Sequence, residues 1–166
     1  MIILGIDPGL ALTGYGLIEE KKNGFCRVTS GTVRTSRETP GAVRLAEIYD
    51  QVTALIARYR PCSVAVEKLF FCKNVRTALQ VGEARGTIIL AAAKSELELY
   101  EYTPLQVKQA VAGYGQADKL QVQRMVELLL KLPQPISAPD EADALAVALC
   151  HLQHRRHHEA VKRGRP

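Results

Sequence analysis

Ile2-Ile3-Leu4-Gly5-Ile6-Asp7-Pro8-Gly9 is the stretch of this sequence that decides the fold. Its short apolar run predicts a strand buried on both faces of a sheet, and the run ends in an acid. Residues 62–67 repeat this pattern, because a second short apolar run again ends in a carboxylate. If the two strands are neighbours, Asp7 and Glu67 project at one edge of the sheet, where the sites of open α/β proteins gather.

The rest of the pattern predicts an α/β protein with a mixed sheet. Two further strands, at 15–20 and 25–34, are joined by an Asn-Gly hairpin turn, so the first three strands should form an antiparallel meander. Strands and helices alternate after the meander, which indicates a sheet covered by helices. The other predicted elements are helices at about 45–59, 75–94, 104–112, 117–132 and from 139 onward, and a strand at 96–102.

Length and composition indicate one soluble globular domain. The chain has 166 residues, of which 47% are hydrophobic and 23% are charged. Asp7 and Pro8 interrupt the first apolar run, so no signal peptide is expected, and no apolar stretch is long enough to span a bilayer. No two of the four cysteines form a C-x-x-C pair. We therefore expect a cytoplasmic protein with reduced thiols and no zinc knuckle.

Most of the net charge of +5 lies at the C-terminus, where residues 155–166 hold five basic residues and one acid. We interpret residues 1–154 as the folded domain and residues 155–166 as a basic tail. The tail is either a phosphate-seeking arm or a disordered, solvated terminus. The histidines next to it are interpreted as a polar helix end and not as a metal site; they are His151, His154, His157 and His158.

Four carboxylates form the candidate site: Asp7, Glu67, Asp140 and Asp143. The last two are three residues apart in the first turn of a predicted helix, so they share one face and are favoured by the helix dipole. Clustered carboxylates repel each other unless a counter-charge is present, and Mg²⁺ prefers oxygen ligands. Two such ions stabilise the attacking and leaving oxygens of a phosphodiester. Taken singly, each acid also has a plain interpretation as a helix-turn, strand-end or loop residue.

Several ordered stretches carry a family resemblance. They are Gly5-Ile6-Asp7-Pro8-Gly9, Thr13-Gly14-Tyr15-Gly16, Val66-Glu67-Lys68-Leu69-Phe70 with Lys73-Asn74, Gly82-Glu83-Ala84-Arg85-Gly86, Gln106-Val107-Lys108-Gln109, Lys119 with Gln121-Val122, and Asp140-Glu141-Ala142-Asp143-Ala144-Leu145-Ala146. From Ile2 to about His151, the chain resembles the RuvC family of bacterial Holliday junction resolvases. The resemblance implies a ribonuclease H-like fold with a five-stranded mixed sheet flanked by helices. It also implies a homodimer that resolves four-way DNA junctions by paired symmetric nicks, in recombination and repair.

The same resemblance implies roles for individual residues and partners. It assigns the four acids to a metal site for two Mg²⁺ ions, for which Mn²⁺ can substitute. The DNA-facing residues of the family map onto Phe70, which would stack on an unpaired base, and onto Lys108 and Lys119. Lys108 is also expected to balance charge in the transition state. Lys73 and Arg76 are further candidates for DNA backbone contacts. The branch-migration complex of RuvA and RuvB is the implied partner.

Other functions stay open from the residues alone. Gly5-Ile6-Asp7-Pro8-Gly9 also resembles the first phosphate loop of actin-like nucleotide phosphotransferases, which normally need two duplicated domains. A non-catalytic junction-binding module is a second alternative, although acids near phosphates bring a pure binder no advantage. A third is a ribonuclease H-like nuclease that cuts RNA–DNA hybrids. Without the resemblance, Lys108 and Lys119 would be read as solvated lysines and Phe70 as a core aromatic.

Overall fold

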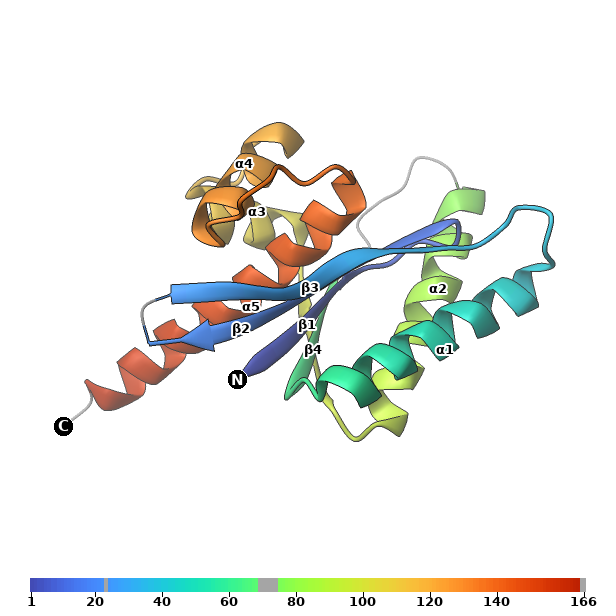
Figure 1. The fold of residues 1–166 in the computed structure, drawn as a ribbon, viewed down its shortest axis with the longest axis horizontal. Helices are drawn as coiled ribbons and strands as arrows, with labels where there is room; N and C mark the ends of the chain where they lie inside the picture. The colour runs from blue at the N-terminus through green and yellow to red at the C-terminus, as the bar shows by residue number, and fades with distance from the viewer. Residues whose placement is uncertain (23, 69–74, 165–166) are drawn as a thin grey trace.

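The computed structural model describes residues 1–22, 24–68 and 75–164. Its centre is a five-stranded sheet in the order β3-β2-β1-β4-β5 (Figure 1). β1 pairs antiparallel with β2, and β2 with β3, whereas β1 and β4, and β4 and β5, pair parallel. The predicted meander and the mixed five-stranded sheet are therefore confirmed. The strands are β1 (Ile2–Asp7), β2 (Leu12–Lys21), β3 (Gly24–Arg34), β4 (Ser63–Glu67) and β5 (Glu98–Tyr102).

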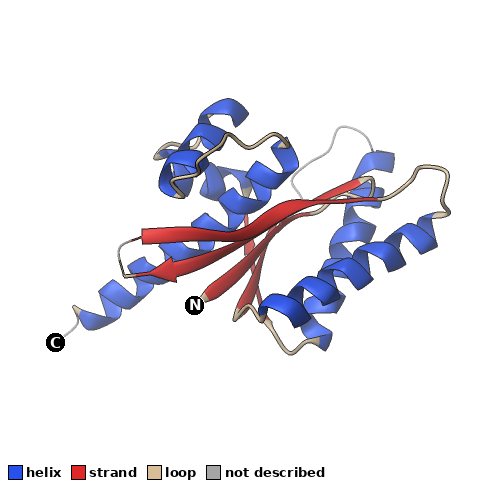
Figure 2. Cartoon of the chain, in the orientation of Figure 1, coloured by secondary structure: helices blue, strands red, loops and turns tan. Residues whose placement is uncertain are grey.

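Helices cover both faces of this sheet, as Figure 2 shows. One layer holds α1 (Gly41–Tyr59) and α2 (Val75–Lys94); the other holds α3 (Pro104–Ala112), α4 (Lys119–Leu129) and α5 (Pro139–Arg163). Alternate residues of β1 pack on opposite faces of the sheet. Ile3 lies in the core under α5, and Leu4 lies in the core under α1 and α2. Both are fully buried. This two-sided burial explains why the first strand is a continuous apolar run.

Capping boxes set the start of the two short helices. The Thr103 hydroxyl accepts a hydrogen bond from the backbone N–H of Gln106, and Pro104 occupies the first helical position, which confirms the predicted start of α3. Asp118 caps α4 in the same way by accepting from the N–H of Gln121 at 2.8 Å. The helix therefore starts at Lys119, slightly later than the pattern predicts, and this lysine lies in its first turn.

The C-terminal segment is helical where the composition predicts disorder. α5 continues to Arg163, and the Arg156 side chain packs against the β2–β3 hairpin. Its Nε lies 2.5 Å from a carboxylate oxygen of Glu20, and its guanidinium lies 4.3 Å from the centre of the Phe25 ring. These contacts lie far apart in sequence, so a local pattern could not reveal them. No helix within the described ranges is long and apolar enough to cross a membrane.

Candidate active site

Parallel pairing of β1 with β4 brings the two strand-end acids together. Ile6 is the register partner of Val66, so Asp7 and Glu67 follow at neighbouring positions at the carboxyl ends of the two strands. Each of the two side chains is partly buried. The expectation that the two strands are neighbours is thus confirmed, and it places two carboxylates at one edge of the sheet.

Helix α5 lies directly on the backbone of β1 and β2, and its N-terminal part carries the other two acids, Asp140 in the first turn and Asp143 three residues later. A side chain added at Gly14 would overlap the backbone of Asp140, and one at Gly5 would overlap the backbone of Ala144 and Ala148. Because Gly14 is the register partner of Asp7, this close approach brings the start of α5 beside Asp7. The role of Gly14 was missed from the sequence, although a glycine inside a strand is a known signal of close backbone approach.

Glu141, which lies between the two acids of α5, points away from them. It accepts a hydrogen bond from Ser30 Oγ at 2.6 Å, and Arg27 Nη1 lies 3.8 Å from the same oxygen. Both partners lie on β3. These contacts hold the first turn of α5 against the sheet.

The four candidate acids interact electrostatically. Burial, followed by the nearby charges of Glu67, Asp143 and Asp140, raises the pKa of Asp7 to about 8, and Lys119 lowers it in part. The pKa of Glu67 is also raised, by burial and then by Asp143. Raised pKa values are the expected result when acids lie close together in a partly buried place without enough positive charge.

Two lysines supply part of the positive charge that offsets these acids. Lys119 Nζ donates to Asp143 Oδ2 at 2.8 Å, and this hydrogen bond is the main reason why the pKa of Lys119 is raised. Lys119 and Lys108 both lower the pKa of Glu67. A cavity of about 270 Å³ contains these groups; it is lined by Glu67, Asp143, Lys108, Lys119, Pro104, Val107 and Val122. Acids from β4 and α5 and lysines from α3 and α4 therefore line one cavity.

The chemistry of this donor set suits a hard divalent cation. Four carboxylates offer only oxygen ligands, and the raised pKa of Asp7 shows that the negative charge here is not fully compensated. Within the described residues, however, no three histidine, cysteine, aspartate or glutamate side chains are arranged so that they could hold one ion. Asp143 instead directs a carboxylate oxygen at Lys119. The acids are thus assembled in one place, but their side chains do not form a finished coordination sphere.

The remaining predicted DNA contacts are only partly visible. Phe70 and Lys73 lie outside the described residues, so their predicted roles stay predictions. Arg76 lies in the first turn of α2 with an exposed side chain. Lys108 lies on α3 and lines the cavity described above.

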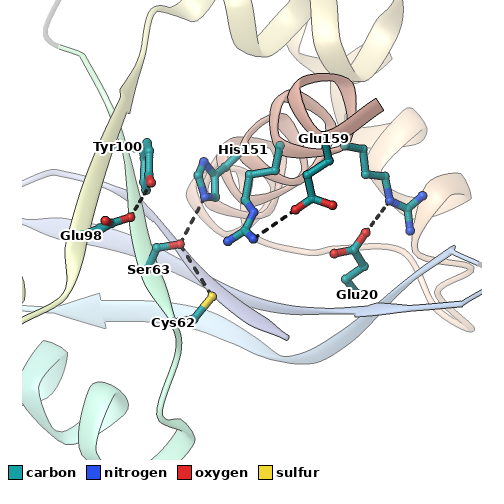
Figure 3. Close-up of polar contacts among 9 residues, drawn as sticks. Glu20, Cys62, Ser63, Glu98, Tyr100, His151 and Glu159 are labelled. Atoms are coloured by element: carbon teal, nitrogen blue, oxygen red, sulfur yellow. Dashed lines mark hydrogen bonds and ion pairs between the residues drawn. The ribbon is translucent and has the colours of Figure 1, made fainter. Parts of the chain in front are cut away.

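A buried polar network that the sequence did not reveal links α5 to the sheet; Figure 3 shows its contact between Ser63 and His151. Tyr102 Oη lies 2.7 Å from Nδ1 of His151, and Ser63 Oγ lies 3.2 Å from its Nε2. The interpretation of His151 as part of a polar helix end is wrong, because its side chain is only 1% exposed. Burial, together with Arg155 and His154, lowers the pKa of His151 to about 4. The neutral ring therefore joins α5 to β4 and β5.

Comparisons with known proteins agree with this arrangement. A family model described as crossover junction endodeoxyribonuclease RuvC matches residues 3–151. The chain is 54% identical over 154 residues to crossover junction endodeoxyribonuclease RuvC of Pelotomaculum thermopropionicum, which covers 93% of this chain and 94% of the relative. It is 57% identical over 150 residues to the protein of the same name from Heliobacterium modesticaldum, covering 90% and 93%. Among solved structures, Thermus thermophilus RuvC in complex with Holliday junction substrate matches with a TM-score of 0.91 at 37% identity, covering 95% of this chain and 96% of that chain.

Proposed function

The chain belongs to the RuvC family of crossover junction endodeoxyribonucleases, and we propose that it resolves Holliday junctions at a metal site formed by Asp7, Glu67, Asp140 and Asp143. Its five-stranded mixed sheet is the ribonuclease H-like fold of these resolvases. The observation that carries the proposal is the raised pKa of Asp7, to which the other three acids each contribute. Carboxylates that interact in this way around one buried acid are what a phosphodiesterase needs to bind divalent cations.

Membership of the family implies the use of a divalent metal, and we infer that two Mg²⁺ ions bind per site, with Mn²⁺ as a substitute. When bound, the cations activate water for attack on phosphorus and stabilise the departing 3′-oxygen. The protein supplies the ligands: Asp7 and Glu67 from the sheet edge, and Asp140 and Asp143 from the N-terminal part of α5. Asp7 has to give up its proton to become a ligand, because carboxylates bind metals in their ionised form.

Lysines on α3 and α4 contact the DNA strand that is cut. Lys108 and Lys119 line the acidic cavity, so a phosphate that approaches the acids also meets two ammonium groups. These groups hold the phosphate and offset charge that grows in the transition state. Arg76 on α2, with Phe70 and Lys73, extends the DNA contact: Phe70 stacks on an unpaired base and the basic residues contact the backbone.

Two copies of the chain act together on one junction. Paired symmetric nicks require two catalytic centres, and a homodimer provides them with matching two-fold symmetry. The nicked products are ready for ligation in recombination and repair. RuvA and RuvB are the proposed partners that move the branch point, and the cytoplasm is the proposed place of action.

A comparison of three substrates tests the function. The purified protein is incubated with a synthetic four-way junction, a linear duplex of the same sequence and an RNA–DNA hybrid, with Mg²⁺ or with EDTA. Cleavage of the junction alone, at symmetric positions and only with Mg²⁺, is the expected result. Cleavage of the hybrid without cleavage of the junction would instead assign the site to a different ribonuclease H-like nuclease.

A further inference from the structure

A second cavity lies beside the candidate active site and has a different chemistry. It measures about 400 Å³ and is lined by Thr103, Pro104, Leu105, Lys108 and Gly115. Pro104 and Lys108 also line the acidic cavity that contains Glu67 and Asp143. The two cavities are therefore adjacent, with Pro104 and Lys108 at their common wall.

The lining of this second cavity, which we call the Leu105 cavity, is mostly apolar. Leu105 is 60% exposed although it lies in the first turn of a helix beside a charged site. Pro104 lines the cavity together with Leu105, and Tyr114 and Leu120 are also exposed on the segments that follow. A gathered apolar surface of this kind indicates a binding site, whereas a single exposed leucine would not.

The walls of the Leu105 cavity are held in place by local structure. The Thr103 hydroxyl is engaged in the capping box of α3, where it accepts from the Gln106 N–H at 3.2 Å. A side chain at Gly115 would overlap the side chain of Leu105, so the absence of a Cβ at this position leaves room for Leu105. Lys108 is thus the charged group of the cavity, and the surface around it presents mainly hydrocarbon.

We propose that the Leu105 cavity holds an unpaired nucleobase of the strand that is cut, next to the scissile phosphate at Lys108. The proposal rests on the proposed function and adds a subsite to it. A nucleotide combines an anionic phosphate with a flat, largely apolar base, and these two parts match a cationic wall followed by an apolar cavity. Only a base that has left its stack can enter a pocket, and a junction offers such bases at lower cost than a continuous duplex.

The Leu105 cavity would therefore help to select the substrate in a way that phosphate contacts cannot. Lys108 touches a group that every nucleotide carries, so it favours all sequences and structures equally. Contacts between Leu105 and a base are made only when a base is present and unpaired. The Leu105 cavity therefore favours cleavage at a junction over cleavage of paired DNA.

The test uses matched junctions, one intact and others with a single abasic site on either side of the cleaved phosphate. Single-turnover cleavage is measured for the wild type, Leu105→Ala, Lys108→Gln and Leu128→Ala. Leu128 is a matched control, because it is 69% exposed on α4 and does not line the cavity. Thermal unfolding of each variant shows that the fold is kept.

We expect the wild type to cut the intact junction about 10-fold faster than one of the abasic junctions, a difference typical of one well-held base. Leu105→Ala should cut both at the slower rate, whereas Leu128→Ala keeps the difference. Lys108→Gln should slow both junctions by the same factor. The proposal is overturned if the abasic site has no effect on the wild type, or if Leu105→Ala slows both junctions equally, as loss of a protein-docking surface would. A wild type that cuts no junction at all overturns the proposed function as well.

Discussion

Lys119 Nζ lies 2.8 Å from Asp143 Oδ2, so the candidate metal site contains an ammonium group of its own. The pair joins the first turn of α4 to the N-terminal part of α5. Lys119 also lowers the pKa values of Asp7 and Glu67, against the effect of burial. One lysine therefore offsets part of the charge of the site and stands where a phosphate would arrive.

Replacement of this lysine should separate catalysis from stability. We expect Lys119→Gln to slow junction cleavage by about 10²-fold, because a charge that assists the transition state is lost. The free energy of unfolding should change by less than about 1 kcal/mol, since the lysine side chain is 77% exposed and exposed ion pairs contribute little. Single-turnover cleavage and urea unfolding measure the two effects. Lys131→Gln, at an exposed lysine just beyond α4, is the control, and unchanged cleavage by Lys119→Gln would remove this residue from the site.

Loss of the central acid should abolish cleavage but not binding. Asp7→Asn keeps the shape of the side chain and removes its charge, so metal binding is lost while DNA contacts made by lysines remain. We expect no detectable cleavage, with junction affinity within a few-fold of the wild type in a gel-shift titration. Asp50→Asn, at an exposed acid of α1, is the matched control. An equal loss of binding and cleavage would show that Asp7 acts through the fold.

Features set by short stretches of sequence were predictable. The two acid-ended strands and the Thr103-Pro104 helix start follow from neighbouring residues alone. The closeness of Asp7 and Asp140 could not be predicted from neighbouring residues. It depends on the β1–β4 pairing and on the way α5 lies across Gly14. The family resemblance supplied that long-range information.

Tertiary contacts also explain what the sequence did not reveal. His151 belongs to a histidine-rich, basic stretch, and this local composition is typical of a solvated helix end. Its partners Ser63 and Tyr102 lie on two other strands, so nothing near it in sequence shows that it is buried. The same holds for Arg156, whose partners lie on the β2–β3 hairpin.

The close approach at Gly14 should be intolerant of even one methyl group. Gly14→Ala would force the backbone of Asp140 away from the sheet, and we expect a loss of about 1–3 kcal/mol of stability together with at least a 10-fold loss of cleavage. Gly86→Ala is the control, because a Cβ there meets nothing within 4 Å and alanine is the better helix former. Urea unfolding and single-turnover cleavage are compared for both variants. Equal behaviour of the two variants would contradict the role of Gly14 in placing α5.

His151 should make stability depend on pH. Its pKa is about 4 in the folded protein and 6.5 as the ordinary value, so between these values the unfolded chain binds the proton and the folded protein does not. The contribution of the neutral histidine is therefore complete above about pH 6.5 and is lost as the pH falls toward 4. After allowance for partial screening by solvent, we expect about 1–2 kcal/mol to be lost between pH 7.5 and pH 5.

The variant His151→Gln isolates this effect from the other groups that titrate in the same range. Glutamine can still hydrogen-bond to Ser63 and Tyr102, but it binds no proton, so its stability should fall less over the same pH interval. The measured quantity is the difference between the two slopes of unfolding free energy against pH, and not the absolute stability of the variant. The other titratable groups are the same in both proteins and cancel in this difference. Coinciding slopes would mean that the ring of His151 reaches solvent and takes up a proton in the folded protein. The network that joins α5 to β4 and β5 would then open in mild acid.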